Sequence, residues 1–171
     1  PIFEDQLVRA DLIIISGERH DDSFDLITRT LQRIGEIKTV EIAIESSGRH
    51  NYGVIGPDKT PVVTLPGDPI AAYISFELLI RPMIRTMLGT ANIHRPSVKA
   101  KLEKALTSSG GMRSYVRAVL SADGKSVAPL SSQDEQATLS DANCFIAVPE
   151  GETHLAAGKE VTVVVLERRY L

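Results

Sequence analysis

VTLPGDP at residues 63–69, followed directly by IAA, is the stretch that indicates the fold of this chain most directly. A β-branched apolar run ends here, a Pro-Gly turn follows, and Asp68 and Pro69 suit the N-cap and the first position of a helix. In an open α/β sheet, ligands bind at the carboxyl ends of the strands, and a helix N-terminus favours anions. The stretch therefore predicts a strand, a turn and a helix, with an anion-binding turn at Gly67 and Asp68.

The residues on either side of this stretch continue an α/β pattern. The apolar run at 12–15 indicates a strand buried on both faces, as in a parallel sheet. Gly35 and Gly89 mark helix ends, Pro82 predicts a kink, and the polar residues 46–51 predict a loop. Strands are expected at 12–15, 39–44, 52–55 and 61–65, and helices at 24–34 and 69–88. This order of elements is typical of an α/β domain.

The pattern changes after Gly89, where residues 90–96 resemble a linker and no further long helix is expected. The sequence ADGK at 122–125 predicts a hairpin turn, and residues 137–142 predict one helical turn. Strands with alternating apolar residues are expected around 98–102, 116–120, 127–130, 144–148 and 161–166. Five short strands in so few residues favour a small β-barrel or sandwich.

The composition, 43% hydrophobic and 24% charged, is that of an ordinary globular protein. The net charge of −3 gives no reason to expect nucleic acid as a partner, and no apolar run approaches the roughly 20 residues of a membrane span. Cys144 is the single cysteine and lies in an apolar run, which favours a small buried hydrophobe. We expect a cytoplasmic location and, because the chain begins at Pro1, a piece of a longer protein.

Three motifs together resemble one known family. They are DLIIISG at 11–17, LPGDP at 65–69 and NCFIAVPEG at 143–151, in this order and spacing. The chain is similar to the molybdopterin molybdenumtransferases, which include MoeA and the E domain of gephyrin. The resemblance implies that residues 1–92 are the second half of the family's α/β molybdopterin-binding domain and that 93–171 are its C-terminal β-barrel domain. It also implies a homodimer for the intact protein.

The chain departs from the family pattern in its anion-binding loops. The family loop GGVSVGD is replaced by GERHDDS at 17–23, which adds side chains and negative charge where glycine N–H groups would face a phosphate. The family element PGKP, which precedes an aromatic residue and a glycine, reads SSGRHNYG at 46–53, so its lysine is replaced or displaced to Arg49. Asp68 stands where the family usually has Asn, and the glycine- and serine-rich segment is altered at 131–136. The sequence therefore keeps the motifs of the family fold but changes the loops that would bind anions.

The resemblance implies an enzyme that inserts molybdate into adenylylated molybdopterin with the help of Mg²⁺. Asp22 and Asp25 are then the predicted catalytic and metal-binding carboxylates. The predicted cofactor-binding residues are Ser16, Gly17, His20, Arg49, Gly67 and Asp68.

The altered loops leave a second function open, a catalytically degenerate scaffold like gephyrin, which would bind peptide segments of partner proteins through the barrel domain. Arg113 and Arg117 flank Tyr115 on a predicted barrel strand and form either an exposed face or a substrate or partner surface. His20 and His50 fall on predicted loops at strand ends and could meet at one pocket, although the histidines lack metal-ligand spacing.

Overall fold

The computed structural model describes residues 7, 9–18, 21–130 and 141–166. The chain divides into two compact units. The first unit contains Pro1–Ile42 and Ser46–Ile80, and the second contains Ala43–Glu45 and Arg81–Leu171. The predicted boundary after residue 92 concerns the family's domains and stays a prediction. Among the described residues, no helix is long and apolar enough to span a membrane.

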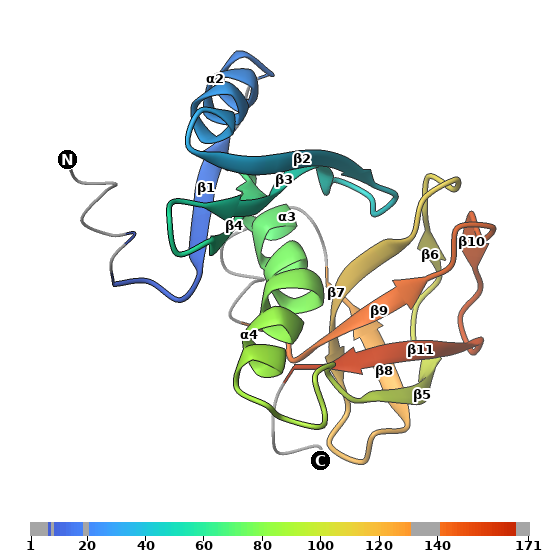
Figure 1. The fold of residues 1–171 in the computed structure, drawn as a ribbon. Coiled ribbons are helices and arrows are strands. Elements are labelled where there is room, and N and C mark those ends of the chain that lie inside the picture. The colour runs from blue at the N-terminus through green and yellow to red at the C-terminus, as the bar shows by residue number, and fades with distance from the viewer. Residues whose placement is uncertain (1–6, 8, 19–20, 131–140, 167–171) are drawn as a thin grey trace. The chain divides into compact units, whose positions relative to one another are not determined.

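A mixed four-stranded sheet forms the centre of the first unit, with the strand order β1-β4-β3-β2 (Figure 1). The β1 and β4 strands run parallel, whereas the β4–β3 and β3–β2 pairs are antiparallel. The strands are β1 (Ile13–Glu18), β2 (Gly35–Ile42), β3 (Gly48–Ile55) and β4 (Thr60–Pro66). The α/β class expected from the sequence is confirmed.

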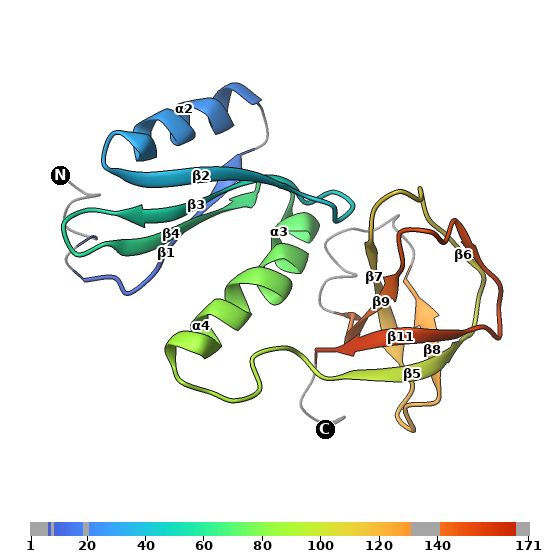
Figure 2. The same ribbon diagram turned by 45° about the vertical axis from the view of Figure 1, so that its right-hand side comes forward.

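Helix α2 (Asp21–Gln32) lies along one face of this sheet (Figure 2). The helix was predicted from apolar residues at helical spacing, and two of them, Phe24 and Leu31, are buried. The core between helix and sheet contains Leu31, Ile55 and Val62, with Leu7, Ile13, Ile15, Ile27 and Ile37 packed around them. This core holds the sheet and the helix together, and so positions the loops at the ends of their elements.

The prediction that the first strand is buried on both faces is wrong. Burial alternates along β1, and Ile14 is 39% exposed while its neighbours Ile13 and Ile15 pack in the core. The reason is the position of β1 at the edge of the sheet, since within the described part of the chain it pairs with β4 alone.

The prediction of a loop at 46–51 is confirmed for residues 46 and 47, which form a turn, and is wrong for 48–51, because β3 already begins at Gly48. The strand pairs with β2 without interruption from Gly48, opposite Ile42, to Ile55, opposite Gly35. Polar residues occupy this part of the strand because the fold gives their side chains hydrogen-bond partners, which a local sequence pattern does not reveal.

The helix expected at 69–88 forms as α3 (Pro69–Ser75), η1 (Phe76–Ile80) and α4 (Arg81–Met87). The η1 segment is a π-helix that ends just before Pro82. Since proline has no N–H, regular α-helical bonding to the carbonyl of Leu78 cannot continue there. The kink predicted near Pro82 is thus found as the π-helical segment η1. Gly89 ends the helix with a φ of 67°, as the sequence predicts.

A closed five-stranded barrel, in the order β11-β5-β8-β7-β9, forms most of the second unit and confirms the predicted barrel (Figure 1). A small pair of strands, β6 (Leu106–Thr107) and β10 (His154–Leu155), is hydrogen-bonded separately. The barrel strands are β5 (Ser97–Leu102), β7 (Ser114–Leu120), β8 (Ser126–Pro129), β9 (Cys144–Val148) and β11 (Glu160–Val165). The helical turn expected at 137–142 falls mostly outside the described residues.

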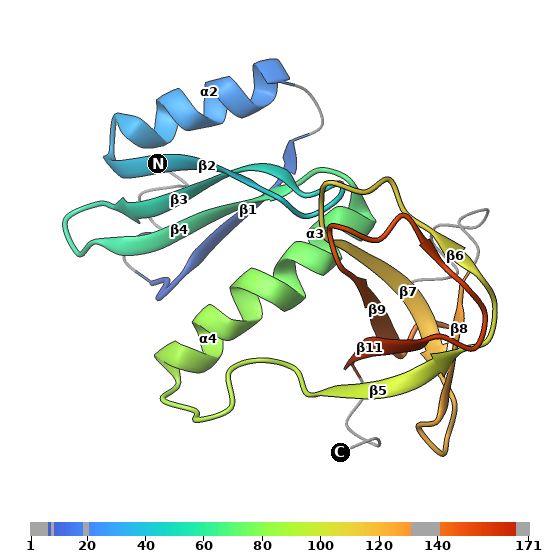
Figure 3. The ribbon, with the colours of Figure 1, turned by 90° about the vertical axis from the view of Figure 1, so that its right-hand side faces the viewer.

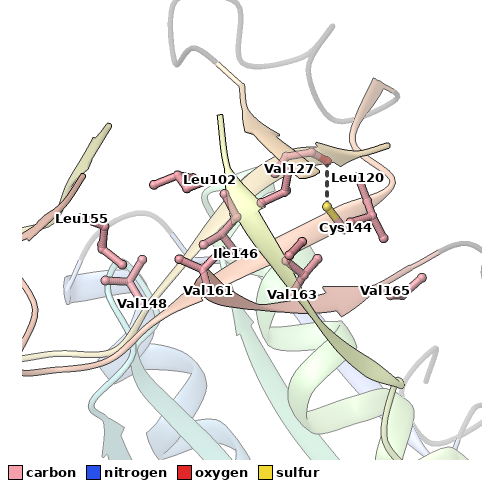
Figure 4. Packing of buried hydrophobic residues seen from close by; sticks show 12 residues of the cluster. Leu102, Leu120, Val127, Cys144, Ile146, Val148, Leu155, Val161, Val163 and Val165 are labelled. Atoms are coloured by element: carbon pink, nitrogen blue, oxygen red, sulfur yellow. Dashed lines mark hydrogen bonds between the residues drawn. The ribbon is translucent and has the colours of Figure 1, made fainter. Parts of the chain in front are cut away.

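The barrel interior is filled by aliphatic side chains that alternate along the strands (Figure 4). Cys144 is part of this core, and its thiol donates a hydrogen bond to the carbonyl of Ala118 at 3.3 Å. Burial raises the pKa of the Cys144 thiol to about 12, so that the side chain remains a neutral, small hydrophobe at physiological pH. The expectation for this residue is confirmed.

Candidate functional site

Three segments meet at one end of the sheet in the first unit (Figure 3). Because β1 and β4 are parallel, their carboxyl ends share one edge, and Glu18 of β1 is paired directly with Pro66 of β4. The β3 strand runs antiparallel to β4, so its first residues, Gly48 and Arg49, lie at this same end. The segments around residues 17, 49 and 67, which are far apart in the sequence, are therefore brought together.

The end of β1 contains an irregularity that suits a close approach of the backbone to a ligand. The register with β4 shifts between Ile15 and Glu18, and the bulge falls on Ser16 and Gly17. Gly17 has a φ of 112°, a conformation that side-chain-bearing residues rarely adopt. Ser16 and Gly17 are both exposed. His20, the third residue predicted for this loop, lies outside the described residues.

The turn after β4 has the geometry that its sequence predicts. Asp68 is the N-cap of α3, and its Oδ1 accepts a hydrogen bond from the N–H of Ala71 at 2.8 Å. Its carbonyl accepts from the N–H of Ala72, and Pro69 occupies the first turn of the helix. One carboxylate oxygen of Asp68 is thus engaged in holding the turn, which fixes the backbone at Gly67.

Replacing Asp68 by alanine is expected to lower the free energy of unfolding by about 0.5–2 kcal/mol, since the N–H of Ala71 loses its acceptor. Asp68→Asn is the matched control, because its amide oxygen can accept the same bond and should keep nearly all of the stability. Urea denaturation of the three proteins measures both effects. An asparagine variant as unstable as the alanine variant would show that the cap is not what this carboxylate contributes.

Arg49 lies between two residues of α2. Its guanidinium carbon is 4.3 Å from the centroid of the Phe24 ring, and its Nη1 is 3.7 Å from Oδ1 of Asp25. Both charged side chains are about half exposed, so this ion pair contributes at most about 1 kcal/mol. The ring and the carboxylate nevertheless orient the guanidinium, and Asp25 offsets part of its positive charge.

Asp22 and Asp25 are exposed and lie one helical turn apart near the start of α2. The described residues contain no group of three or more His, Cys, Asp or Glu side chains that could hold a metal ion. Mg²⁺, however, is usually held by one or two carboxylates together with substrate phosphates. The pair fits that mode of binding, although Asp25 is shared with Arg49.

His50 does not lie on a loop, as the sequence had indicated, but is buried within β3. Its Nδ1 is 2.8 Å from the carbonyl oxygen of Thr64, and its Nε2 is 2.8 Å from Oγ of Ser47, which in turn lies 3.0 Å from Oγ of Ser75 in α3. These side chains are all nearly inaccessible to solvent. The chain of hydrogen bonds therefore connects β4, the start of β3 and α3, and serves to position the sheet end.

In the second unit, Arg113 is exposed and paired with Glu150 at 3.2 Å, whereas Arg117 is only 8% exposed. A single exposed face made of both arginines is therefore excluded.

Glu45, which was not predicted as a site residue, accepts hydrogen bonds from Ser109 and Ser114. These two bonds lower the pKa of its carboxyl group despite partial burial.

The contact between Arg49 and the Phe24 ring and the contact between Ser47 and Ser75 were not predicted from the sequence. Phe24 has the apolar character of a core residue, and no local pattern shows that a cation will lie over its ring. Ser47 and Ser75 are separated by 28 positions, so only the fold brings their hydroxyl groups together.

The mixed sheet with its helices, together with the separate closed barrel, defines an α/β protein with an additional barrel domain. Comparison with known proteins narrows this class. Residues 99–166 match the family model of the MoeA C-terminal region (domain IV). Molybdopterin molybdenumtransferase 1 of Mycobacterium tuberculosis is 32% identical over 96% of this chain and 41% of its own length. Molybdopterin molybdenumtransferase 2 of the same organism is 32% identical over 95% of this chain and 42% of its own length.

A solved structure agrees with these relatives. The crystal structure of a molybdopterin biosynthesis MoeA protein from Pyrococcus horikoshii has a TM-score of 0.79 and 28% identity, and the match covers 97% of this chain and 40% of that one. The chain belongs to the MoeA family and corresponds to its C-terminal portion. It spans about two fifths of the length of the curated relatives that it matches.

Proposed function

We propose that the protein to which this chain belongs is a molybdopterin molybdenumtransferase, which inserts molybdate into adenylylated molybdopterin during molybdenum cofactor biosynthesis. The observation that carries this proposal is the convergence of the β1 bulge, the Pro-Gly turn and Arg49 at one end of the sheet. The similarity to two molybdenumtransferases over nearly the whole chain supports it. Such a reaction requires positioning and charge neutralisation of phosphate and molybdate rather than a covalent nucleophile.

In this proposal, the exposed residues Ser16 and Gly17 and the half-buried Gly67 lie against the pterin substrate. Asp68 and His20 take part in binding it. Arg49 binds its phosphate, since a guanidinium fork matches phosphate oxygens. Asp22 and Asp25 hold Mg²⁺, which would neutralise phosphate charge when bound. We further propose a cytoplasmic homodimer for the intact protein, as the family resemblance implies.

Arg49→Gln is expected to weaken binding of adenylylated molybdopterin by roughly 10- to 150-fold, the equivalent of about 1.5–3 kcal/mol for a lost hydrogen bond to a charged group. Arg49→Lys keeps the positive charge but not the two parallel N–H donors of the guanidinium group, so its loss of affinity should be smaller. Arg29→Gln removes the same charge from an exposed position in the last turn of α2 and is the matched control. Equilibrium binding to the intact protein measures all three. Equal effects at positions 49 and 29 would contradict a direct contact between Arg49 and phosphate.

A second function is favoured by one specific observation. Arg49, the cation proposed for phosphate, is already paired with Asp25, and the neighbouring loop at 17–23 is acidic. If these charges exclude the pterin, the protein acts instead as a scaffold that binds peptide segments of partner proteins through the barrel domain. Pull-down with the intact protein would then recover a specific partner that is lost when the barrel surface is mutated. Tight pterin binding without any such partner would refute the scaffold function.

A further inference from the structure

The second unit contains a cavity of about 710 Å³ formed by α4 and the segment that follows it. All of its described lining residues belong to this one unit, and none of them is among the residues proposed for the pterin site. The cavity is lined by Arg81, Arg85, Ala91, Asn92, Ile93, His94, Arg95, Pro96 and Ser97.

In the described part of the chain, the charged side chains that line this cavity are all basic. Three guanidinium groups, those of Arg81, Arg85 and Arg95, border the cavity together with the imidazole of His94. Among the described residues that line it, none is an Asp or Glu. Arginine is always protonated in proteins, so that the positive charge here does not depend on pH in the physiological range. The volume lies within the usual range for pockets that bind small molecules.

Hydrogen bonds to the backbone hold the three arginines in place. Nη1 of Arg81 donates to the carbonyl of Ile93 at 3.0 Å, and Nε of Arg85 donates to the carbonyl of Asn92 at 2.6 Å. Arg95 donates through Nη1 to the carbonyl of Leu166 at 2.7 Å. Each of these bonds fixes the orientation of one guanidinium group. Side chains that are already ordered lose less entropy when a ligand binds.

The last carbonyl groups of α4 accept hydrogen bonds from the chain itself, which reduces their repulsion of a bound anion. A helix C-terminus carries partial negative charge on its unsatisfied carbonyls. Here the carbonyl of Thr86 accepts from the N–H of Gly89 at 2.9 Å, and that of Arg85 accepts from both the N–H and the hydroxyl of Thr90. This Schellman-type ending turns the last carbonyls toward donors of the chain itself.

We propose that this cavity binds a small phosphate ester whose remaining part is aliphatic and hydroxylated. Arginine forks match phosphate oxygens, which accounts for the three guanidinium groups. Asn92 and Ser97 can bond hydroxyl groups, and Ala91, Ile93 and Pro96 supply aliphatic contacts. Among the described lining residues there is no Phe, Tyr or Trp ring on which a nucleobase could stack. This site is independent of the proposed pterin site and does not rest on the proposed function.

An NMR titration of the isotope-labelled 171-residue chain tests the proposal at constant ionic strength. The probes are glycerol 3-phosphate, inorganic phosphate and glycerol. Glycerol 3-phosphate should give saturable shifts confined to the cavity lining, that is, the side-chain N–H signals of Arg81 and Arg85, the amides of residues 91–95 and 97, and the ring of His94. It should bind at least about ten times more tightly than glycerol. Absence of saturable shifts, or equal binding of glycerol, would overturn the site. Equal affinity for inorganic phosphate would overturn its assignment to an ester.

Two variants of Arg85 and one control separate a binding site from a general charge effect. Arg85→Gln should weaken binding of glycerol 3-phosphate about tenfold, and Arg85→Lys should fall between this variant and the unaltered chain. Arg33→Gln removes an exposed charge outside the cavity and should leave the affinity unchanged. Equal losses at positions 85 and 33 would contradict the proposal. If Arg85→Gln does not fold, the comparison of glycerol 3-phosphate with glycerol on the unaltered chain still decides it.

Discussion

Replacement of Ile146 by alanine is expected to lower the free energy of unfolding of the second unit by about 2–5 kcal/mol. Ile146 is fully buried in the barrel core (Figure 4). It is paired with Val116 of β7 and with Val163 of β11. Truncation removes three carbon atoms from a closed interior that cannot collapse around the gap, so that a cavity cost adds to the lost transfer free energy. A loss of this size is a large fraction of the total stability of a typical domain.

Urea unfolding followed by the methyl signals of the barrel valines measures this loss without interference from the first unit. Val119→Ala is the matched control, because Val119 is in β7 but is 37% exposed. We expect the control to change the free energy by no more than about 0.5 kcal/mol. Similar losses for both variants would contradict the assignment of Ile146 to the centre of the core.

Replacement of Gly53 by alanine is expected to destabilise the first unit by about 3 kcal/mol, at the upper end of the usual cost of overpacking. Gly53 lies in β3 between Ile37 of β2 and Val62 of β4. A Cβ atom at this position would fall 2.0 Å from the carbonyl oxygen of Glu36. The neighbouring atom belongs to the backbone, so that no side-chain rotation can relieve the clash and the two strands must move apart.

The same substitution should also disturb the candidate site. Because Arg49 and His50 belong to the same strand, a displacement of β3 would also move Arg49 relative to Phe24 and the ring of His50 relative to the carbonyl of Thr64. Hydrogen exchange of the β2 and β3 amides together with thermal unfolding measures the effect. Gly151→Ala is the control, since a Cβ there meets nothing within 4 Å and the backbone is not in the left-handed region. A stable Gly53→Ala protein with unchanged exchange would contradict this register.

Where burial follows the local period of the sequence, the elements could be predicted well. The expected strand at 161–166 forms as β11, in which Val161, Val163 and Val165 alternate and face the common interior of the barrel. The N-cap at Asp68 and the helix end at Gly89 could be predicted from the sequence equally well, since each depends on the conformation of only a few neighbouring residues.

The features that the sequence did not reveal depend on contacts between distant residues. β3 begins earlier than expected because Thr64 provides partners for His50 and for the N–H of Asn51. Residues 43–45 belong to the second unit because Ile44 forms a bridge with Arg113, a contact across almost 70 positions that no local pattern contains.

The candidate site shows the same limit. The motifs indicated which loops lie at strand ends, and the structure brings those of Gly17, Arg49 and Gly67 to one end of the sheet. The pairing of Arg49 with Asp25 was not predicted, because the sequence pointed to Asp25 only as a catalytic and metal-binding carboxylate and does not show that a residue of β3 lies beside the first turns of α2. The role of each residue toward a pterin stays a prediction.

Genetic complementation tests the proposed function most directly. The complete open reading frame that encodes this chain is expressed in a bacterium that lacks its own molybdenumtransferase, and the activity of a molybdoenzyme such as nitrate reductase is measured. We predict restored activity, reduced by Arg49→Gln and retained by Arg29→Gln. No activity from a soluble, folded protein would contradict the molybdenumtransferase function and leave the scaffold function in its place.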